Sequence, residues 1–350
     1  MLTQSQIELL HHALEKSQHP FFIFHDDPDG LASYLLLLKH YKKGTGMAVK
    51  AKPHVTEEYC RYPQEHNADT VFVLDIALVD QEFIDTVKLP VYWIDHHPVQ
   101  EPKRAHYFNS RHTGKNIPTP VMCLQITNNP AHVWLATLGA IGDWYWPAYA
   151  EQCRIDYPDL LPQPVNTVPD ALYNTLMGVL IHLFSFNLKG TSQDVKRSIH
   201  YLEQIEDPYE ILNQTSSAGS FVWKRYLNIK HAYDLLKEKA LRSTPKEGLY
   251  VFTYTADTLS LTKDLANELL YRFPNTVIIL GRHKSGEYRC SIRAPITINI
   301  SKHLPELVQG IRAKGGGHEQ AIGIGVHEDD WEIFLARMKD VVQEEQRIET

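Results

Sequence analysis

Short apolar runs alternate with helical patterns over residues 20–145, and this alternation restricts the fold strongly. The runs FFIF (21–24), VFVLD (71–75) and VYWID (91–95) are apolar almost without a break, and helix-like segments occupy 31–43 and 131–142. Strands with continuous apolar sequence are typical of a parallel sheet that is covered by helices on both faces. We therefore predict an α/β fold for this part of the chain.

Polar side chains follow each of these segments at the point where it ends. The residues concerned are His25, Asp27, Asp29, Asp75, Asp95, His96, His97 and Asp143. Because ligands of parallel sheets bind beyond the carboxyl ends of the strands, we expect these side chains to converge. A turn or a helix cap explains any one of the aspartates equally well, and the two histidines could be solvated in a turn. The recurrence at every strand end favours one shared site.

A site with four or more carboxylates repels itself unless cations neutralise it. Oxygen and imidazole ligands without a thiolate suit Mn²⁺ or Mg²⁺ better than zinc. The number of ligands indicates two ions, and a pair about 3.5–4 Å apart is the usual arrangement for in-line attack on phosphorus. The four cysteines are scattered along the chain and form no CxxC pair, which favours reduced thiols in a cytoplasmic protein.

The rest of the sequence predicts two further parts. A proline-rich stretch near 147–169 precedes a mostly helical segment at about 170–240, and STPKEG (243–248) reads as a linker. Strand patterns then resume and end in an amphipathic helix. We predict a catalytic domain at 1–165, a helical extension and linker at 166–245, and a smaller α/β domain at 246–350.

Charge and hydropathy exclude some classes of function. The formal net charge is −7, so bulk electrostatics do not favour tight, nonspecific nucleic-acid binding. No apolar run reaches the length of a membrane span, and the N-terminus does not resemble a signal peptide. Residues 276–318 contain seven Lys or Arg against two Glu, and a solvated face is the plain explanation of this bias.

The motifs HDDPDG, VLD, DHH and GAIGD, in this order and spacing, resemble motifs I to IV of the DHH phosphoesterase superfamily. The later SIRA and KGGGHEQAIGIGV resemble the glycine-rich substrate domain that accompanies many members. The resemblance covers residues 20–145 and 246–345. Motif I has the form H-x-D-x-D-G, closer to the RecJ-like branch than to the pyrophosphatases and oligoribonucleases, because Leu31 stands where their last aspartate would be.

The resemblance implies a role for each site residue. It implies that His25, Asp27 and Asp29 supply one side of a two-metal site, that Asp75 bridges the ions, and that His96 and Asp143 complete the second side. Asp95 would orient His96 from outside the metal shell, and His97 would contact the scissile phosphate. The implied substrate-binding residues are His97, Arg111, Ser291, Arg293, Gly315, Gly316, Gly317 and His318.

Two of these substrate contacts have simpler explanations. Consecutive glycines can form a backbone nest for an anion, or merely a tight turn. Arg111 is equally well explained as a surface arginine. If the glycine motif binds substrate, the active site lies in a cleft between the two α/β domains.

The expected function is that of an enzyme, a Mn²⁺-dependent (or Mg²⁺-dependent) exonuclease or oligonucleotidase. It would trim single-stranded DNA or RNA, or short oligonucleotides, to 5′-mononucleotides. One alternative is a phosphodiesterase of cyclic dinucleotides or other small nucleotides, and another is a replication or repair scaffold without catalysis. The 166–245 helical segment is a candidate surface for a homodimer or a protein partner, and no membrane association is expected.

Overall fold

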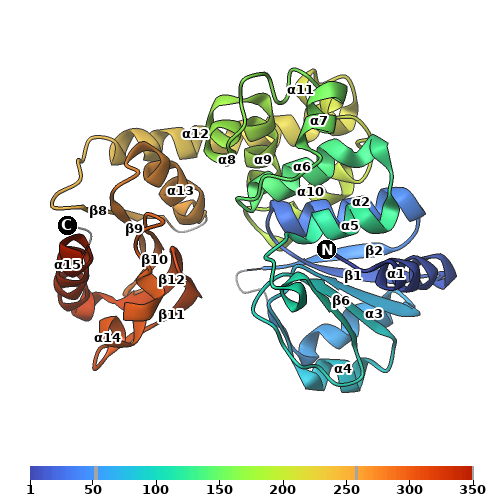
Figure 1. The fold of residues 1–350 in the computed structure, drawn as a ribbon, viewed down its shortest axis with the longest axis horizontal. Helices are drawn as coiled ribbons and strands as arrows, with labels where there is room; N and C mark the ends of the chain where they lie inside the picture. The colour runs from blue at the N-terminus through green and yellow to red at the C-terminus, as the bar shows by residue number, and fades with distance from the viewer. Residues whose placement is uncertain (51–53, 257–258, 349–350) are drawn as a thin grey trace. The chain divides into compact units, whose positions relative to one another are not determined.

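The computed structural model describes residues 1–50, 54–256 and 259–348. It divides into two compact units, Met1–Tyr226 and Leu227–Thr350 (Figure 1). The predicted three-part division at residues 165 and 245 stays a prediction. Among the described helices, none combines the length and the apolar character that a bilayer crossing requires.

The first unit is built on a five-stranded parallel sheet. Its order is β2 (Thr45–Val49), β1 (Pro20–His25), β4 (Thr70–Leu74), β6 (Val91–Asp95) and β7 (His106–Asn109). The three apolar runs form β1, β4 and β6 at the centre of the sheet, and the parallel α/β fold predicted from them is confirmed. Strands β2 and β7 are at the edges and are less apolar, so the sequence pattern did not reveal them.

Helices cover both faces of this sheet. The helices of this part of the chain are α1 (Gln4–Lys16), α2 (Pro28–Tyr41), α3 (Arg61–Glu65), α4 (Gln81–Val87), α5 (Thr119–Thr127) and α6 (Val133–Gly142). It also contains the short paired strands β3 (His54–Val55) and β5 (Leu78–Val79) and the 3₁₀ turns η1 (Glu57–Cys60), η2 (Ser110–Thr113) and η3 (Pro130–His132). Helices α2, α5 and α6 pack together on one side, and α3 and α4 lie on the other (Figure 1). The central strands are therefore buried on both faces, as their continuous apolar sequence requires.

A helical layer completes the first unit and runs into the second. It comprises α7 (Ala150–Asp156), α8 (Val168–Asn174), α9 (Leu176–Asn187), α10 (Ser192–Leu202), α11 (Pro208–Leu212) and α12 (Ser217–Ala240). Helix α9 packs on α2 and α6. The Tyr34 hydroxyl of α2 donates to the Glu203 carboxylate at 2.6 Å, and Lys39 Nζ donates to the Glu203 carbonyl at 2.9 Å. These partly buried bonds attach the layer to α2, which covers the sheet.

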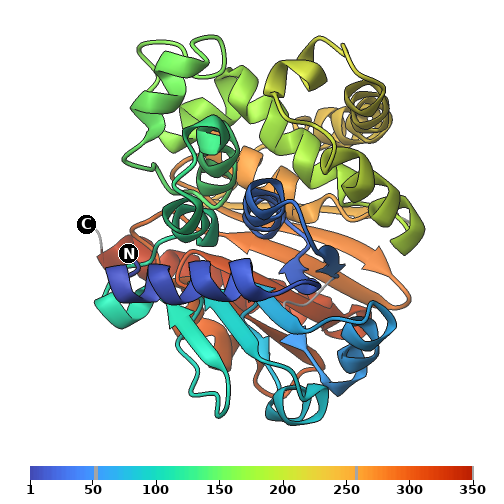
Figure 2. The same cartoon turned by 90° about the vertical axis from the view of Figure 1, so that its right-hand side faces the viewer.

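The second unit contains a separate mixed sheet. Its order is β11 (Ala313–His318), β12 (Ala321–His327), β10 (Glu287–Arg293), β9 (Val277–Lys284) and β8 (Leu249–Thr255), in which only β8 and β9 are parallel. The other elements are α13 (Thr262–Arg272), α14 (Leu304–Val308), α15 (Trp331–Ile348), η4 (Ile300–His303) and η5 (Glu328–Asp330). Helix α15 buries its apolar stripe against one face of the sheet, and α13 packs on β9 and β10. Figure 2 gives a second view of these elements.

The glycine run of the second unit is a strand. The sequence predicts a backbone nest over Gly315–Gly317, but these residues lie in β11, at an edge of the sheet, in extended pairing with β12. A nest requires successive residues of opposite helical hand, which an extended strand does not provide. The nest prediction is wrong, and any anion contact of these glycines comes from an open strand surface.

Candidate metal centre

The carboxyl ends of three central strands bring the predicted side chains together. His25 ends β1, Asp75 follows β4, and Asp95 ends β6 immediately before His96 and His97. The three strands are parallel and in register, so these residues share one edge of the sheet. Asp75 has φ +56°, in the left-handed region that aspartate tolerates better than most residues.

The turn from β1 into α2 is tight enough to place three ligand candidates in one small region. Asp27 caps α2 by accepting a hydrogen bond from Gly30 N at 3.1 Å. A Cβ on Gly30 would lie 2.5 Å from the His25 carbonyl oxygen, so glycine is required there. Asp29 lies in the first turn of α2 and is fully buried.

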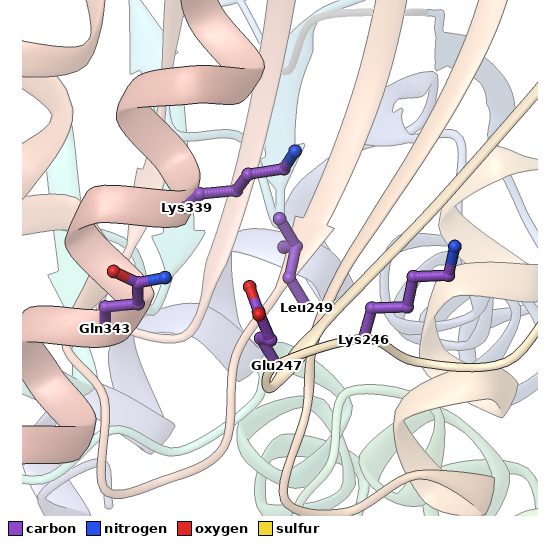
Figure 3. A pocket seen from close by; sticks show the side chains of 5 residues that line it. All are labelled: Lys246, Glu247, Leu249, Lys339 and Gln343. Atoms are coloured by element: carbon purple, nitrogen blue, oxygen red, sulfur yellow. The ribbon is translucent and has the colours of Figure 1, made fainter.

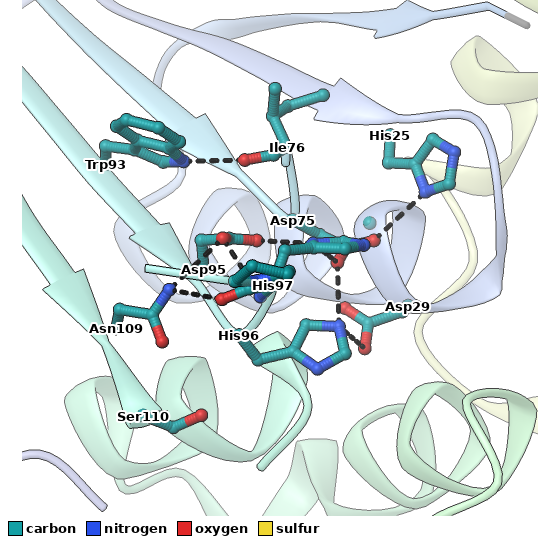
Figure 4. A network of polar contacts seen from close by, with 12 residues as sticks. His25, Asp29, Asp75, Ile76, Trp93, Asp95, His96, His97, Asn109 and Ser110 are labelled. Atoms are coloured by element: carbon teal, nitrogen blue, oxygen red, sulfur yellow. Dashed lines mark hydrogen bonds and ion pairs between the residues drawn. The ribbon is translucent and has the colours of Figure 1, made fainter. Parts of the chain in front are cut away.

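One group of ligand atoms consists of His25, Asp27 and Asp75. His25 Nδ1 is 3.0 Å from Asp27 Oδ2. The same atom is 3.3 Å from Asp75 Oδ2 (Figure 4). The three side chains offer one imidazole nitrogen and two carboxylate oxygens within 4.8 Å of one another. This combination of donors suits a divalent cation with a preference for oxygen and nitrogen.

A second group consists of Asp29, His96 and Asp143. His96 Nε2 is 3.9 Å from Asp29 Oδ2, 3.7 Å from Asp143 Oδ2 and 3.2 Å from Asp75 Oδ1. Asp75 thus faces His25 with one oxygen and His96 with the other, as the bridging role implies. The resemblance implies that Asp29 accompanies His25 and Asp27, whereas the structure groups it with His96 and Asp143.

Asp95 contacts His97 and not His96. His97 Nδ1 is 2.7 Å from Asp95 Oδ1, and its backbone N–H donates to Asp95 Oδ2 at 3.0 Å. The expected Asp95–His96 pairing is therefore wrong, because consecutive side chains after the strand point in different directions. Asn116 takes the place beside His96, with its Oδ1 2.9 Å from His96 Nδ1.

Two further residues hold the DHH segment in place. Asn109 Nδ2 donates to the His97 carbonyl at 2.9 Å, and Arg111 Nε donates to the His96 carbonyl at 2.7 Å. Neither Asn109 nor Asn116 was among the predicted site residues. The sequence FNSR (108–111) was the available signal for Asn109, which ends β7, whereas the more distant Asn116 had none.

The buried carboxylates of this cluster fit bound cations. Both oxygens of Asp29 are buried and make no hydrogen bond among the described residues, and Asp75 is also buried. Burial of a carboxylate without hydrogen bonds costs several kcal/mol unless a positive charge compensates for it. Two divalent ions, one in each group and both contacting Asp75, would supply that charge.

The carboxylates of the cluster raise the pKa values of its histidines. Burial opposes protonation of His25, but the carboxylates of Asp27 and Asp75 outweigh it and raise the pKa of His25 to about 10. His96 is also desolvated, yet Asp75, Asp143 and Asp29 raise its pKa well above the usual range. Burial, followed by repulsion from Asp75, raises the pKa of the Asp29 carboxyl. The cluster therefore favours positive charge strongly.

The predicted substrate contacts of the second unit lie on β10 and β11. Ser291 is nearly buried on β10, and Arg293 ends that strand. Arg293 Nε donates to Asn267 Oδ1 of α13 at 2.5 Å, and its Nη1 donates to the Ile292 carbonyl at 2.8 Å. The side chain of His318 lies outside the described part of the structure.

The second unit matches a known domain family. The DHHA1 domain model matches residues 250–344. No curated protein sequence matches the chain.

Solved structures share the fold of the whole chain. RecJ from Thermus thermophilus in complex with Mn²⁺ matches with a TM-score of 0.70 and 14% identity, over 97% of this chain and 54% of that one. The chain thus spans about half the length of that RecJ. A manganese-bound exonuclease RecJ matches with a TM-score of 0.63 and 14% identity, over 96% and 93% of the two chains.

A third solved structure, CDC45 from Entamoeba histolytica, has a TM-score of 0.57 and 12% identity, over 97% and 99% of the two chains. At these identities, the likeness establishes the fold and not the activity. The comparisons thus establish a DHHA1 domain match over residues 250–344 and a RecJ-like fold for the chain.

Proposed function

We propose that the protein is a metal-dependent phosphodiesterase, an exonuclease or oligonucleotidase that hydrolyses single-stranded or short nucleic acids to 5′-mononucleotides. The observation that carries this proposal is the position of Asp75, with His25 at 3.3 Å on one side and His96 at 3.2 Å on the other. A carboxylate shared by two ligand groups is the arrangement that a two-metal phosphoesterase requires.

The two ions would be Mn²⁺, with Mg²⁺ as the alternative. His25, Asp27 and Asp75 would hold one ion, and Asp29, His96, Asp143 and Asp75 the other. The ligand atoms are oxygen and imidazole nitrogen, which both ions accept, and the two RecJ structures contained manganese. Bound ions of this kind act as Lewis acids on the phosphoester and lower the pKa of the attacking water.

His97 is the residue of this chain best placed to contact the reacting phosphate. It is a partly exposed neighbour of Asp75, with Nδ1 3.8 Å from Asp75 Oδ1. Asp95 accepts from His97 Nδ1 and so directs Nε2 away from the strand. Burial opposes protonation of His97, but Asp95 and Asp75 outweigh it and raise the pKa of His97. From this position His97 would contact the phosphate and stabilise its charge or assist proton transfer.

The other proposed substrate contacts hold the substrate and do not activate water. Arg111, Ser291 and Arg293 would contact phosphate oxygens, because guanidinium and hydroxyl donors form charge-assisted hydrogen bonds with them. Gly315, Gly316 and Gly317 would let the substrate approach the strand backbone closely.

A non-enzymatic replication or repair scaffold is the second candidate, because the fold alone does not establish catalysis. The complete set of ligand groups around Asp75 favours the enzyme. Hydrolysis of cyclic dinucleotides or other small nucleotides would use the same centre. We place the protein in the cytoplasm, since its four cysteines are all buried and unpaired. The helical layer remains our candidate surface for a partner or a second copy.

The decisive experiment is product analysis on end-labelled 5-mer and 30-mer DNA and RNA, together with cyclic dinucleotides. Each substrate is incubated with Mn²⁺, with Mg²⁺ and with excess EDTA. We expect 5′-mononucleotides from the linear substrates with Mn²⁺ and no product with EDTA. Full turnover in EDTA would contradict the two-metal centre, and cleavage of cyclic dinucleotides alone would replace the proposed substrate. Absence of any hydrolysis would support the scaffold.

A further inference from the structure

An exposed tryptophan follows Asp143, one of the candidate metal ligands of the first unit. The side chain of Trp144 is 42% exposed. Trp93, Trp134 and Trp331, by contrast, are buried. Single exposed apolar residues are ordinary on protein surfaces, so exposure alone assigns no role to Trp144. Its backbone conformation and its position at the metal centre do.

The backbone of Trp144 is strained. It has φ +59° directly after the end of α6, at a place where a glycine or an asparagine is usual. The other non-glycine residues with positive φ in the described part of the chain are Lys, Asn, Asp, Arg, Gln, Glu or Ser, and none is aromatic. A bulky side chain rarely adopts this conformation. Strain of this kind concentrates at functional sites, and Asp75 of the metal centre is a second example in this chain.

The end of α6 lies against the metal centre. A Cβ added to Gly142 would be 3.0 Å from Cβ of Pro28. The last turn of α6 therefore packs on the first turn of α2, which carries Asp29. The next residue, Asp143, belongs to the second group of ligand atoms. Because consecutive Cα atoms are about 3.8 Å apart, Trp144 lies at the rim of this group.

The metal centre is open to solvent on the side of Asp143. The side chain of Asp143 is 35% exposed, and the other five candidate ligands are at most 16% exposed. The exposed indole of Trp144 thus stands beside the most accessible ligand. Its neighbour Tyr145 differs, because it packs against buried residues of α5 and α6. Trp144 is the residue of this aromatic pair that is available to a ligand.

We propose that Trp144 is a stacking surface for the nucleobase of the nucleotide whose phosphate lies at the metal centre. Aromatic side chains stack on bases without reading their sequence, because every base has a π face. An indole offers no such contact to inorganic phosphate or to a sugar phosphate without a base. The inference rests on the proposed function and narrows its substrate class to phosphoesters that carry a base, of any sequence.

Binding of 5′-AMP and of ribose 5-phosphate tests the proposal, since these ligands share the sugar and the phosphate and differ in the base. Neither contains a phosphodiester bond, so calorimetric titration of the full-length protein is possible with Mn²⁺ present. Trp144→Asn removes the ring and places a residue that tolerates positive φ, and Trp144→Phe keeps a ring. Urea denaturation of the same variants shows whether the indole contributes to folding.

Lys339→Ala is the control for phosphate binding elsewhere. Lys339 is an exposed lysine of α15 that lines a cavity of about 410 Å³ in the second unit (Figure 3). The described residues around this cavity include a second lysine, Lys246, and no aromatic side chain. A ligand held there by its phosphate would lose affinity in Lys339→Ala and show no preference for the base.

We expect the unaltered protein to bind 5′-AMP about tenfold more tightly than ribose 5-phosphate, which is about 1.4 kcal/mol. Trp144→Asn should lose this preference through weaker binding of 5′-AMP alone, without a loss of stability, because it relieves the strained backbone. Trp144→Phe should keep most of the preference, and Lys339→Ala all of it.

Three results would overturn the inference. They are equal binding of the two ligands by the unaltered protein, an unchanged preference in Trp144→Asn, and equal weakening of both ligands in Trp144→Asn together with a loss of stability. Because binding is measured without turnover, a protein that prefers 5′-AMP through Trp144 but hydrolyses no phosphodiester would contradict the proposed function alone.

Discussion

At the level of single residues, Asp75 is the side chain that both ligand groups share. It is 1% exposed and adopts a left-handed backbone conformation with φ +56°. Asparagine tolerates that conformation, whereas alanine would add backbone strain. Asp75→Asn therefore removes the charge and keeps the local geometry, which makes it a cleaner test than Asp75→Ala.

We predict that Asp75→Asn lowers kcat/KM by more than about a hundredfold. Loss of an outer partner of a ligand already costs about 10–100-fold, and Asp75 contacts both ligand groups directly. Hydrolysis assays measure the loss of kcat/KM, and calorimetric titration with Mn²⁺ measures the loss of metal affinity. Asp85→Asn, at a surface carboxylate that pairs with Arg104, is the control and should behave as the unaltered protein. Wild-type turnover in Asp75→Asn would show that the assignment of the centre is wrong.

Asn116 has a different role, because it acts through His96. Its Oδ1 lies 2.9 Å from His96 Nδ1 and fixes the ring so that Nε2 faces the carboxylates. We predict that Asn116→Ala weakens Mn²⁺ binding by about 10–100-fold, and that Asn116→Asp, which keeps an acceptor at the same place, restores most of it. If Asn116→Ala binds Mn²⁺ as tightly as the unaltered protein, the ring is held by packing alone.

At the level of secondary elements, a buried carboxylate joins two helices of the second unit. Glu268 of α13 is 4% exposed and accepts a hydrogen bond from Tyr233 of α12 at 2.5 Å. It also pairs with Arg272 at 2.8 Å and with Lys237 of α12 at 3.4 Å. Burial opposes its ionisation, but these donors outweigh burial and lower the pKa of Glu268.

We predict that Glu268→Gln destabilises the protein at pH 7 by about 1–3 kcal/mol, because it removes the acceptor of charge-assisted bonds. A carboxyl with a lowered pKa stabilises the fold above its unfolded pKa, near 4.3, and loses this contribution as the pH falls through its folded pKa. The difference in free energy of unfolding between the unaltered protein and Glu268→Gln should therefore be constant near pH 7 and shrink below about pH 4. Urea denaturation at several pH values measures it, and a difference that grows in acid would contradict the assignment.

At the level of the whole molecule, charge limits how the protein holds nucleic acid. The net charge is −7, so affinity cannot come from a broadly basic surface. The cations that we assign to the substrate are few: Arg293 lies at the end of β10, and Arg111 lies beside the DHH segment. A site of this size contacts only a few nucleotides.

We predict that a 30-mer is cleaved no more efficiently than a 5-mer, as measured by kcat/KM. Additional nucleotides would meet no further cations assigned here. Steady-state kinetics on a series of 5′-phosphorylated oligonucleotides of equal composition tests this. Strong preference for the 30-mer with processive degradation would require a binding groove other than the one described.

Local sequence alone determined much of this architecture. Continuous apolar runs predicted β1, β4 and β6, because a strand buried on both faces has no polar positions. The same reasoning located the carboxyl ends of these strands, and with them His25, Asp75 and the DHH triplet. The chemical type of the cluster, oxygen and imidazole without thiolate, was also readable from the sequence, since it depends only on which residues follow the strands.

Only the tertiary structure decided which side chains pair with which. The grouping of Asp29 with His96 and Asp143, the contact of Asp95 with His97, and the position of Asn116 depend on how helices and loops pack beside the sheet. The glycine run became an edge strand because β12 offered it backbone partners, which no local preference of glycine predicts. Pairing of this kind is a long-range property, so sequence spacing cannot reveal it.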